Sequence, residues 1–373
     1  MSESSTMPMA DDLLGAEQAS TFHAILGEAA GAELPELRAA SAPAALGPLA
    51  LSARASALAD AALAGLPTNA AAVARTLRAA AQDPAFEGWL IWPAGLAATR
   101  SALAAGDEQS FDEAMDVLAL LTPRNTSEFA IRELLRARPE RGLAIMRTWV
   151  SHPNHHVRRL ASEGSRPLLP WGLRVPELVR NPELAAPILE ELRGDPEDYV
   201  YRSVANHLND HSRQHPHWVL ERATAWAQRP LGSSTWVIKH GLRTLIKRGD
   251  PGALALLGFS GADLAVDGPR VATTSVPFTG ELRFCASITN AGSVPAKVAI
   301  DWALHLRGAR GAARRKVFKL AAPTLAPGER LEVERTFSFR PITTRAYYPG
   351  EHAVELLVNG ASHGPVPFEL LAS

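Results

Sequence analysis

The pattern of apolar and polar positions changes once along the chain, near residue 257. Before that point, Ala and Leu recur at spacings of three and four residues, the period of an amphipathic helix, between breaks at Gly and Pro. Beyond it, apolar and polar residues alternate between turn residues, as in short strands. The pattern predicts a helical domain over residues 10–256 and a β domain over residues 257–373. Residues 1–9 are small and polar and are predicted to be disordered.

The middle of the helical region repeats itself. His152-Pro153 precedes Val157, and Asp195-Pro196 precedes Val200, in the same register and 43 residues apart. This spacing is typical of HEAT repeats, which contain two helices each. We therefore expect an all-α HEAT-like solenoid, in which equivalent residues of successive repeats lie side by side.

A basic residue stands two places after the aligned apolar residue in each repeat and in two weaker copies of the pattern. Stacked repeats would line up these residues along one concave wall, as a basic track suited to a DNA backbone. The alternative is that they are separate, solvated surface cations. The four positions are Arg132, Arg159, Arg202 and Lys239.

The region after residue 257 contains five clear strand patterns. Five to seven short strands in about 110 residues predict an immunoglobulin-like sandwich. The only cysteine, Cys285, excludes an internal disulfide, and its strand-like neighbours predict a buried apolar position. The five patterns cover residues 283–289, 298–302, 317–320, 331–337 and 351–360.

Charge is distributed unevenly, although the formal net charge is only -1. Residues 1–120 carry 5 Lys and Arg against 15 Asp and Glu, whereas residues 121–250 carry 20 against 14 and residues 251–373 carry 13 against 10. The body of the chain is therefore basic, which is compatible with a nucleic-acid partner.

Three acids in the repeat region lie at helical spacing from a cation or an amide. They occupy equivalent regions of different repeats, so we expect them to converge on the concave surface. The alternative for Glu163, which Arg159 and Arg166 flank, is an exposed ladder of ion pairs. The spacings of four residues join Glu128 to Arg132, Arg159 to Glu163 and Asn206 to Asp210.

Several other kinds of site have no pattern in this sequence. We find no phosphate-binding Gly-rich loop, no nucleophile elbow and no His-Glu-x-x-His. His155 and His156 are adjacent and would point apart on a helix, so neither a metal nor a cofactor is expected. No run of eighteen apolar residues and no basic-then-apolar start appear, so no membrane association is expected and the expected location is the cytoplasm.

Three motifs resemble a known family. The segment 154–167, followed by Pro170-Trp171-Gly172, closely resembles the signature of the AlkC-type DNA alkylation repair glycosylases, relatives of AlkD built from HEAT-like repeats. Segments 127–132 and 203–210 are similar to two further motifs of that family, in the family's order. Some members carry a C-terminal immunoglobulin-like domain, so the resemblance extends over the whole chain.

The resemblance implies hydrolysis of the N-glycosidic bond of cationic N-alkylated bases in double-stranded DNA, within base excision repair and by a monomer. The substrates implied are 3-methyladenine and, as a second candidate, 3-methylcytosine. A cationic base leaves readily, so carboxylates that stabilise the developing sugar cation and position a water suffice without a metal. Carried over by motif, the candidate catalytic residues are Glu163, Asp210 and Glu128.

The candidate DNA-binding residues of the helical domain comprise one aromatic residue and six polar ones. Trp171 is expected to stack on the lesion or a sugar, and its alternative is packing at a repeat junction. For Asn206 the alternative is hydrogen bonding between repeats. The polar candidates are Arg132, Arg159, Arg166, Arg202, Asn206 and Lys239.

Two basic segments of the β domain, 310–319 and 340–345, are predicted to be loops that contact phosphates. The sandwich would then close over the duplex opposite the basic track. The alternative is that both loops only add solvated charge. The candidate residues are Arg315, Lys316, Lys319 and Arg345.

Two other classes of protein remain open. A non-catalytic HEAT scaffold would bind DNA or protein, with structural acids. A catalytically silent DNA-binding member would keep salt-dependent DNA binding but release no base.

Overall fold

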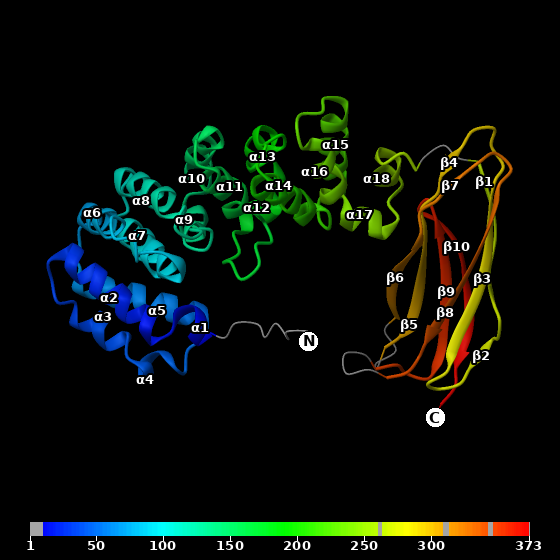
Figure 1. Cartoon of the computed structure of the whole chain (residues 1–373), viewed down its shortest axis with the longest axis horizontal. Coiled ribbons are helices and arrows are strands. Elements are labelled where there is room, and N and C mark those ends of the chain that lie inside the picture. Colours follow the sequence, from blue (N-terminus) through cyan, green and yellow to red (C-terminus); the bar gives the residue numbers. More distant parts are fainter. Residues whose placement is uncertain (1–9, 260–262, 309–312, 342–345, 373) are drawn as a thin grey trace. The chain divides into compact units, whose positions relative to one another are not determined.

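The computed structural model describes residues 10–259, 263–308, 313–341 and 346–372. Helices are followed by strands along the chain (Figure 1), so the predicted fold class is confirmed. Contacts divide the chain into a first unit, Met1–His215 with Arg229–Gly241, and a second unit, Pro216–Gln228 with Leu242–Ser373. The exact ends of the two domains remain predictions, and residues 1–9 lie outside the described residues.

The helices of the first unit form two rows (Figure 1). In one row α5 packs on α7, α7 on α9, α11 on α14 and α14 on α16; in the other α2 packs on α6, α6 on α8, α8 on α10 and α10 on α13. The first row consists of α5 (Leu51–Gly65), α7 (Ile91–Ala105), α9 (Ile131–Ala137), α11 (His155–Gly164), α14 (Asp198–His211) and α16 (Ser234–Gly241). The second row consists of α2 (Ala16–Ala30), α6 (Ala70–Ala80), α8 (Glu108–Leu121), α10 (Pro139–Thr148) and α13 (Ala186–Leu192). Shorter helices are α1 (Ala10–Leu14), α3 (Pro35–Ala40), α4 (Pro43–Leu46), α12 (Pro176–Arg180), η1 (Gly88–Leu90), η2 (Trp149–Ser151) and η3 (Pro182–Leu184).

The start and the buried face of α11 follow from its sequence. The Asn154 side chain accepts a hydrogen bond from the backbone N–H of His156 at 2.8 Å, which caps the helix. Val157, Leu160 and Gly164 form the buried stripe. A Cβ at Gly164 would lie 2.9 Å from Ile131 Cγ2, so α9 packs closely on α11.

The repeat predicted from the 43-residue spacing is present. Val157 and Val200 are both buried, on the neighbouring helices α11 and α14. Repeated valines thus face the interior between repeats, as expected for HEAT-like packing.

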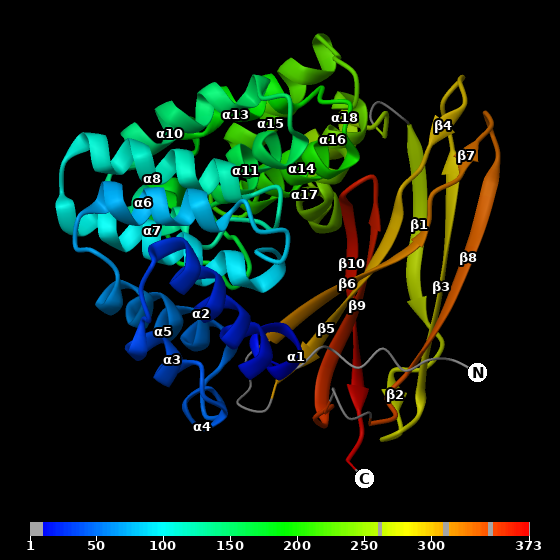
Figure 2. The ribbon, with the colours of Figure 1, turned by 60° about the vertical axis from the view of Figure 1, so that its left-hand side comes forward.

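The second unit contains three helices and a β-sandwich. Its sheets have the orders β1-β3-β8, β2-β10-β9-β5-β6 and β4-β7 (Figure 2). The helices are α15 (Pro216–Gln228), α17 (Arg243–Arg248) and α18 (Pro251–Leu256). The strands are β1 (Leu264–Val271), β2 (Ser275–Val276), β3 (Glu281–Asn290), β4 (Ala296–Lys297), β5 (Ile300–Arg307), β6 (Ala313–Ala321), β7 (Thr324–Leu325), β8 (Arg330–Ser338), β9 (Gly350–Val358) and β10 (Ala361–Leu370).

Two long strands were not among the five predicted. β1 and β10 each contain a Gly-Pro pair, Gly268-Pro269 and Gly364-Pro365, which reads as a turn in sequence. In the structure the pairing register shifts at each pair, so the strand continues past the interruption. The five predicted patterns correspond to β3, β5, β6, β8 and β9.

The sandwich core is aromatic. Trp302 stacks on Phe318 with ring centroids 4.5 Å apart and contacts Phe284 at 5.2 Å. Phe284 and Ala286 point inward, so Cys285 between them is exposed. The prediction of a buried cysteine was wrong because alternation along β3 places this residue on the outer face.

Among the described helices, none alone has the length and apolar character needed to cross a bilayer. Helices α5 and α6, bent by 115° at their junction, meet the length and composition criteria only as a pair.

Candidate functional site

Five side chains of alternating charge form one connected network in the first unit. Arg166 Nε and Nη2 donate to the two carboxylate oxygens of Asp210, at 2.9 and 3.1 Å, and Arg166 Nη1 donates to Glu163 Oε1 at 2.6 Å. Arg159 Nη2 lies 3.5 Å from the same Glu163 oxygen, and Arg159 Nη1 donates to Glu128 Oε2. These five residues, Glu128, Arg159, Glu163, Arg166 and Asp210, are called the acid–arginine network below.

The network is largely buried, since Glu128, Glu163 and Arg166 are buried and Arg159 and Asp210 are partly exposed, and residues from three repeats form it. Glu128 precedes α9, Arg159 and Glu163 lie on α11, and Asp210 lies in the last turn of α14. Glu163 is only 5% exposed, so the interpretation of this residue as part of an exposed ion-pair ladder is wrong. The two arginines join the three acids, and the convergence of these acids on a concave surface stays a prediction.

The network contains one more carboxylate than guanidinium. Three acids face two arginines, and the buried Arg132 guanidinium lies close enough to Glu128 and Asp210 for their charges to oppose the lowering of its pKa by burial. Burial alone would lower the pKa of Arg166, but hydrogen bonds and charge from Asp210 and Glu163 raise it. Arg166 therefore stays charged.

Hydrogen bonds between α11 and α14 fix the two helices that carry most of the network. Ser203 Oγ donates to Ser162 Oγ at 2.9 Å, and His207 Nδ1 lies 3.1 Å from the Ser162 carbonyl oxygen, to which it donates. Arg158 donates twice to Asp195, at 2.7 and 3.2 Å, near the start of the same helices. Burial lowers the pKa of His207 well below its ordinary value, so its ring is neutral.

Tyr199 covers Arg159. The Arg159 guanidinium carbon lies 4.6 Å from the Tyr199 ring centroid, and Arg159 Nη1 also donates to Thr126 Oγ1 at 3.2 Å. Thr126 in turn donates to Glu128 at 2.8 Å. The ring and the hydroxyl hold Arg159 between two acids.

Trp171 lies in the segment between α11 and α12 and is 74% exposed, so the alternative of packing at a repeat junction is excluded. Its φ of 60° is unusual for a residue with a side chain and indicates a backbone held in place by its surroundings. An exposed indole on a constrained backbone is suited to stacking on a ligand.

The basic track does not form as predicted. Arg132 is fully buried and donates to the backbone carbonyls of Gly164 and Arg166, both at 2.8 Å, and of Leu173. The prediction that Arg132 contacts DNA is wrong, because its guanidinium is used inside the fold. Arg159 belongs to the acid–arginine network.

Two residues of the predicted track remain at the surface. Arg202 is exposed, pairs with Asp198 at 2.6 Å and lies over the Trp236 ring at 5.4 Å. Lys239 is exposed on α16. DNA contact by Arg202, Lys239 and the half-buried Asn206 stays a prediction.

The predicted basic loops of the second unit are partly strand. Arg315, on β6, donates to Glu355 at 2.9 and 3.2 Å, and His305 contacts the same carboxylate at 2.7 Å. Burial raises the pKa of Glu355, but hydrogen bonds from Arg315, Ser362 and His305 lower it to about 2. Arg315 is thus paired with Glu355 while its side chain stays partly exposed, and its contact with DNA stays a prediction.

The other candidates of that domain differ in their surroundings. Lys316 lies over the Phe318 ring at 5.3 Å, whereas Lys319 is exposed and pairs in register with Asp301. Arg345 lies outside the described residues. DNA contact by Lys316, Lys319 and Arg345 is not tested by this structure.

Sequence reasoning missed Tyr199, Thr126 and His207. Tyr199 immediately precedes the repeated Val200, and His207 stands inside the 203–210 motif, so position in the repeat was the only available indication. Nothing in sequence shows that a histidine will be buried between two helices.

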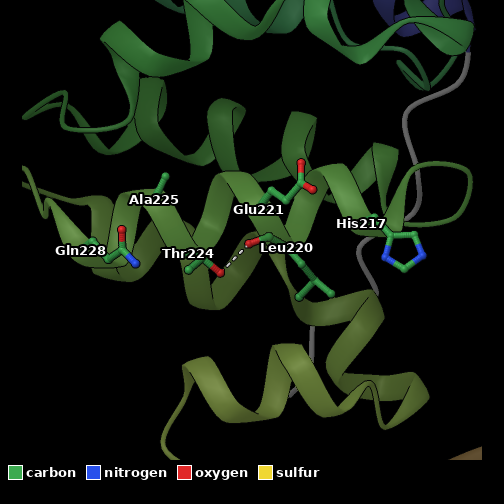
Figure 3. A pocket seen from close by; sticks show the side chains of 6 residues that line it. All are labelled: His217, Leu220, Glu221, Thr224, Ala225 and Gln228. Atoms are coloured by element: carbon green, nitrogen blue, oxygen red, sulfur yellow. Dashed lines mark hydrogen bonds between the residues drawn. The ribbon is translucent and has the colours of Figure 1, made fainter.

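A shallow hollow elsewhere lies along α15 in the second unit (Figure 3). Thr224 Oγ1, at its wall, donates to the Leu220 carbonyl oxygen at 2.7 Å, within the same helix. One helix supplies the whole lining and no candidate acid is part of it, so this hollow is not the candidate site. Its lining residues are His217, Leu220, Glu221, Thr224, Ala225 and Gln228. Across the described ranges, no group of three or more His, Cys, Asp or Glu is arranged to hold a metal.

The repeats, the sandwich and the buried network define the chain as a HEAT-like repeat protein with an immunoglobulin-like domain. The family model described as the C-terminal Ig-like domain of uncharacterised protein YhaZ matches residues 265–372. Uncharacterized protein YhaZ of Bacillus subtilis (strain 168) is 38% identical over 262 residues, 70% of this chain and 72% of YhaZ. Pseudomonas fluorescens alkylpurine DNA glycosylase AlkC, solved bound to DNA containing an abasic site analogue, is 33% identical, with a TM-score of 0.78 over 98% of this chain and 100% of AlkC.

The chain therefore belongs to the AlkC-type family of DNA alkylation repair proteins with an immunoglobulin-like C-terminal domain, which includes YhaZ. The resemblance of the three sequence motifs is confirmed over the full length.

Proposed function

We propose that the protein is a DNA glycosylase that removes cationic N-alkylated bases from double-stranded DNA. The observation that supports this most directly is the largely buried acid–arginine network, which joins three carboxylates from three repeats. The likeness to AlkC, whose solved complex contains DNA with an abasic site analogue, supports the same reaction class.

The chemistry follows from charge. As the C1′–N bond breaks, its electron pair neutralises the cationic base and positive charge moves to the sugar. A carboxylate held in a site of low polarity stabilises that charge far better than water would. Water then adds to C1′ and its proton passes to a carboxylate, which leaves an abasic sugar and a neutral base. Glu163 and Asp210 are the proposed catalytic pair, and Glu128 the third acid.

Each remaining member of the site has a proposed part. Arg159 and Arg166 hold the acids in fixed positions, and Trp171 stacks on the lesion or its sugar. Arg202, Asn206 and Lys239 contact the duplex. The proposed substrates are 3-methyladenine and 3-methylcytosine, and neither a metal nor a partner subunit takes part.

Base release distinguishes this function from its alternatives. The full chain is incubated with duplex DNA containing one 3-methyladenine or 3-methylcytosine, in EDTA, and free base is measured by mass spectrometry and abasic sites by alkaline cleavage. Release of methylated base with matching strand cleavage is the expected result. Salt-dependent DNA binding without release would identify a silent DNA-binding member, and absence of binding would identify a protein scaffold.

A further inference from the structure

Arg132 is a buried cation, and among the residues that the structure describes no carboxylate lies within hydrogen-bonding distance of it. It is 0% exposed, and burial together with the charges of Arg174 and Arg166 lowers its pKa to about 10. Burying a guanidinium costs free energy unless it makes good hydrogen bonds. The bonds that compensate Arg132 are those to three backbone carbonyls.

These carbonyls lie at the two ends of one segment. Gly164 and Arg166 begin the segment, with Arg132 Nη1 2.8 Å from each carbonyl oxygen, and Leu173 ends it, accepting from Arg132 Nε. One planar fork therefore closes residues 164–173 into a loop. Lys could not replace it, because a single ammonium lacks donors fixed at these angles.

The closed loop carries Trp171 at its exposed end. Trp171 has a positive φ, and its neighbour Gly172 packs on Arg132: a Cβ at Gly172 would lie 3.1 Å from Arg132 Cδ. Leu169 is buried at 1% exposure and anchors the middle of the loop. Arg132 thus contacts Gly172, the residue directly after Trp171.

The same guanidinium also contacts the acid–arginine network. Arg166, whose carbonyl accepts from Arg132, bridges Glu163 and Asp210 with its side chain. The Arg132 guanidinium therefore holds the backbone near both Trp171 and Arg166.

We propose that Arg132 is a positioning residue that sets Trp171 at a fixed place relative to the acid–arginine network. It touches no DNA. The proposal rests on the proposed function in one respect, that Trp171 and the network act on the same alkylated nucleotide.

Arg54 provides a matched control. It is also buried, at 2% exposure, and donates to the carbonyls of Leu49 and Leu14 at 2.9 and 3.2 Å, far along the chain from Trp171. Unlike Arg132, it also pairs with a carboxylate, that of Asp11, at 2.6 Å. A general effect of losing a buried arginine would appear equally in Arg54→Lys and Arg132→Lys.

The test follows Trp171 directly by 19F NMR of the full chain labelled with 5-fluorotryptophan. Of the eight tryptophan resonances, Trp171→Phe identifies the one that belongs to Trp171. Arg132→Lys should shift or broaden this resonance and leave the others in place, and Arg54→Lys should not affect it. An unchanged Trp171 resonance in folded Arg132→Lys overturns the proposal.

Gly172→Ala is a second variant that retains Arg132. Its added Cβ would press on Arg132 Cδ at 3.1 Å and Leu169 Cδ2 at 2.8 Å, so the Trp171 resonance should move as in Arg132→Lys. If Arg132→Lys does not fold, an unchanged Trp171 resonance in Gly172→Ala overturns the proposal.

Single-turnover base release tests whether the placement of Trp171 by Arg132 affects the rate of the reaction. At saturating enzyme, Arg132→Lys should release base roughly tenfold to a hundredfold more slowly, with DNA affinity within about threefold of wild type. A wild-type rate in a variant whose Trp171 resonance has moved overturns the positioning role. If the wild-type chain releases no base, the proposed function fails, while the NMR result still decides whether Arg132 places Trp171.

Discussion

Among the candidate acids, Glu163 contacts both arginines of the acid–arginine network. It accepts from Arg166 at 2.6 Å, lies 3.5 Å from Arg159 and is almost fully buried. Arg166 keeps its two bonds to Asp210 when Glu163 is neutralised, so an amide at position 163 tests charge with little rearrangement.

Glu163→Gln and Asp210→Asn should each slow base release by roughly two orders of magnitude or more, because the carboxylate that stabilises the sugar cation is lost. DNA affinity should hold or rise, since one negative charge near phosphates is removed. Single-turnover release and fluorescence anisotropy measure the two effects, and thermal unfolding confirms that each variant is folded.

The control for these variants is Glu177→Gln. Glu177 pairs with Arg180 at 2.9 Å on the surface of α12, where an ion pair contributes little to stability. It should release base at the wild-type rate. Normal release by either Glu163→Gln or Asp210→Asn would remove that residue from the mechanism.

The contacts of Glu163 with Arg159 and Arg166 could be predicted from the sequence, whereas the burial of Arg132 could not. Glu163 lies four residues after Arg159 and three before Arg166, and residues at these spacings are neighbours on a helix, so the sequence alone predicts these contacts. The partners of Arg132 are carbonyls 32 to 41 residues away in sequence, and a helical period says nothing about them. Arg132 and Arg202 occupy the same repeat position, yet Arg132 is buried and Arg202 is exposed. The repeat position alone therefore does not predict burial.

At the scale of elements, α14 carries two buried histidines, His207 and His211. His207 and His211 stack with ring centroids 5.5 Å apart, and burial lowers the pKa of both, that of His211 to about 4. Since folded His211 binds its proton only near that value, both rings are neutral at pH 7.

Acid should therefore destabilise the first unit before any carboxylate titrates fully. As the pH falls through 6.5, His211 of the unfolded chain takes up a proton while the folded one does not until about pH 4, so the free energy of unfolding falls across this window. In His211→Asn the slope of that free energy against pH should flatten by about 1.4 kcal/mol per pH unit.

Urea unfolding at a series of pH values measures the slope. A wild-type slope in His211→Asn would show that this ring is not held neutral in the fold.

Element prediction was most reliable where the pattern was regular. The repeated His152-Pro153 and Asp195-Pro196 located α11 and α14, and alternation located five strands. β1 and β10 were not predicted, because a strand with a Gly-Pro interruption is stabilised by its neighbouring strands, here β3 and β9.

For the whole molecule, the predicted contribution of the second unit to DNA binding rests on exposed cations with different surroundings. Arg315 and Lys319 are both exposed, but Arg315 donates to Glu355. If the sandwich closes over the duplex as the sequence predicts, Lys319→Ala should weaken DNA binding and reduce the log–log salt slope by about one, the value for one lost phosphate contact.

Lys297→Ala offers a comparison on the same domain, since Lys297 is also exposed but lies on β4, away from the basic segments. Anisotropy titrations at several salt concentrations measure both variants. If Lys319→Ala and wild type have equal DNA affinity and equal salt slope, Lys319 makes no phosphate contact and only adds charge to the surface.

The bonds between α11 and α14 also determine how the solenoid opens. In repeat arrays each repeat contacts only its neighbours, so terminal repeats fray while internal ones open together. Arg158–Asp195, Ser203–Ser162 and Arg166–Asp210 join two repeats from the first turn of α11 to the last turn of α14. Amide hydrogens of these two helices should therefore exchange slowly and with one common opening free energy, so that the site forms a single cooperative folding unit.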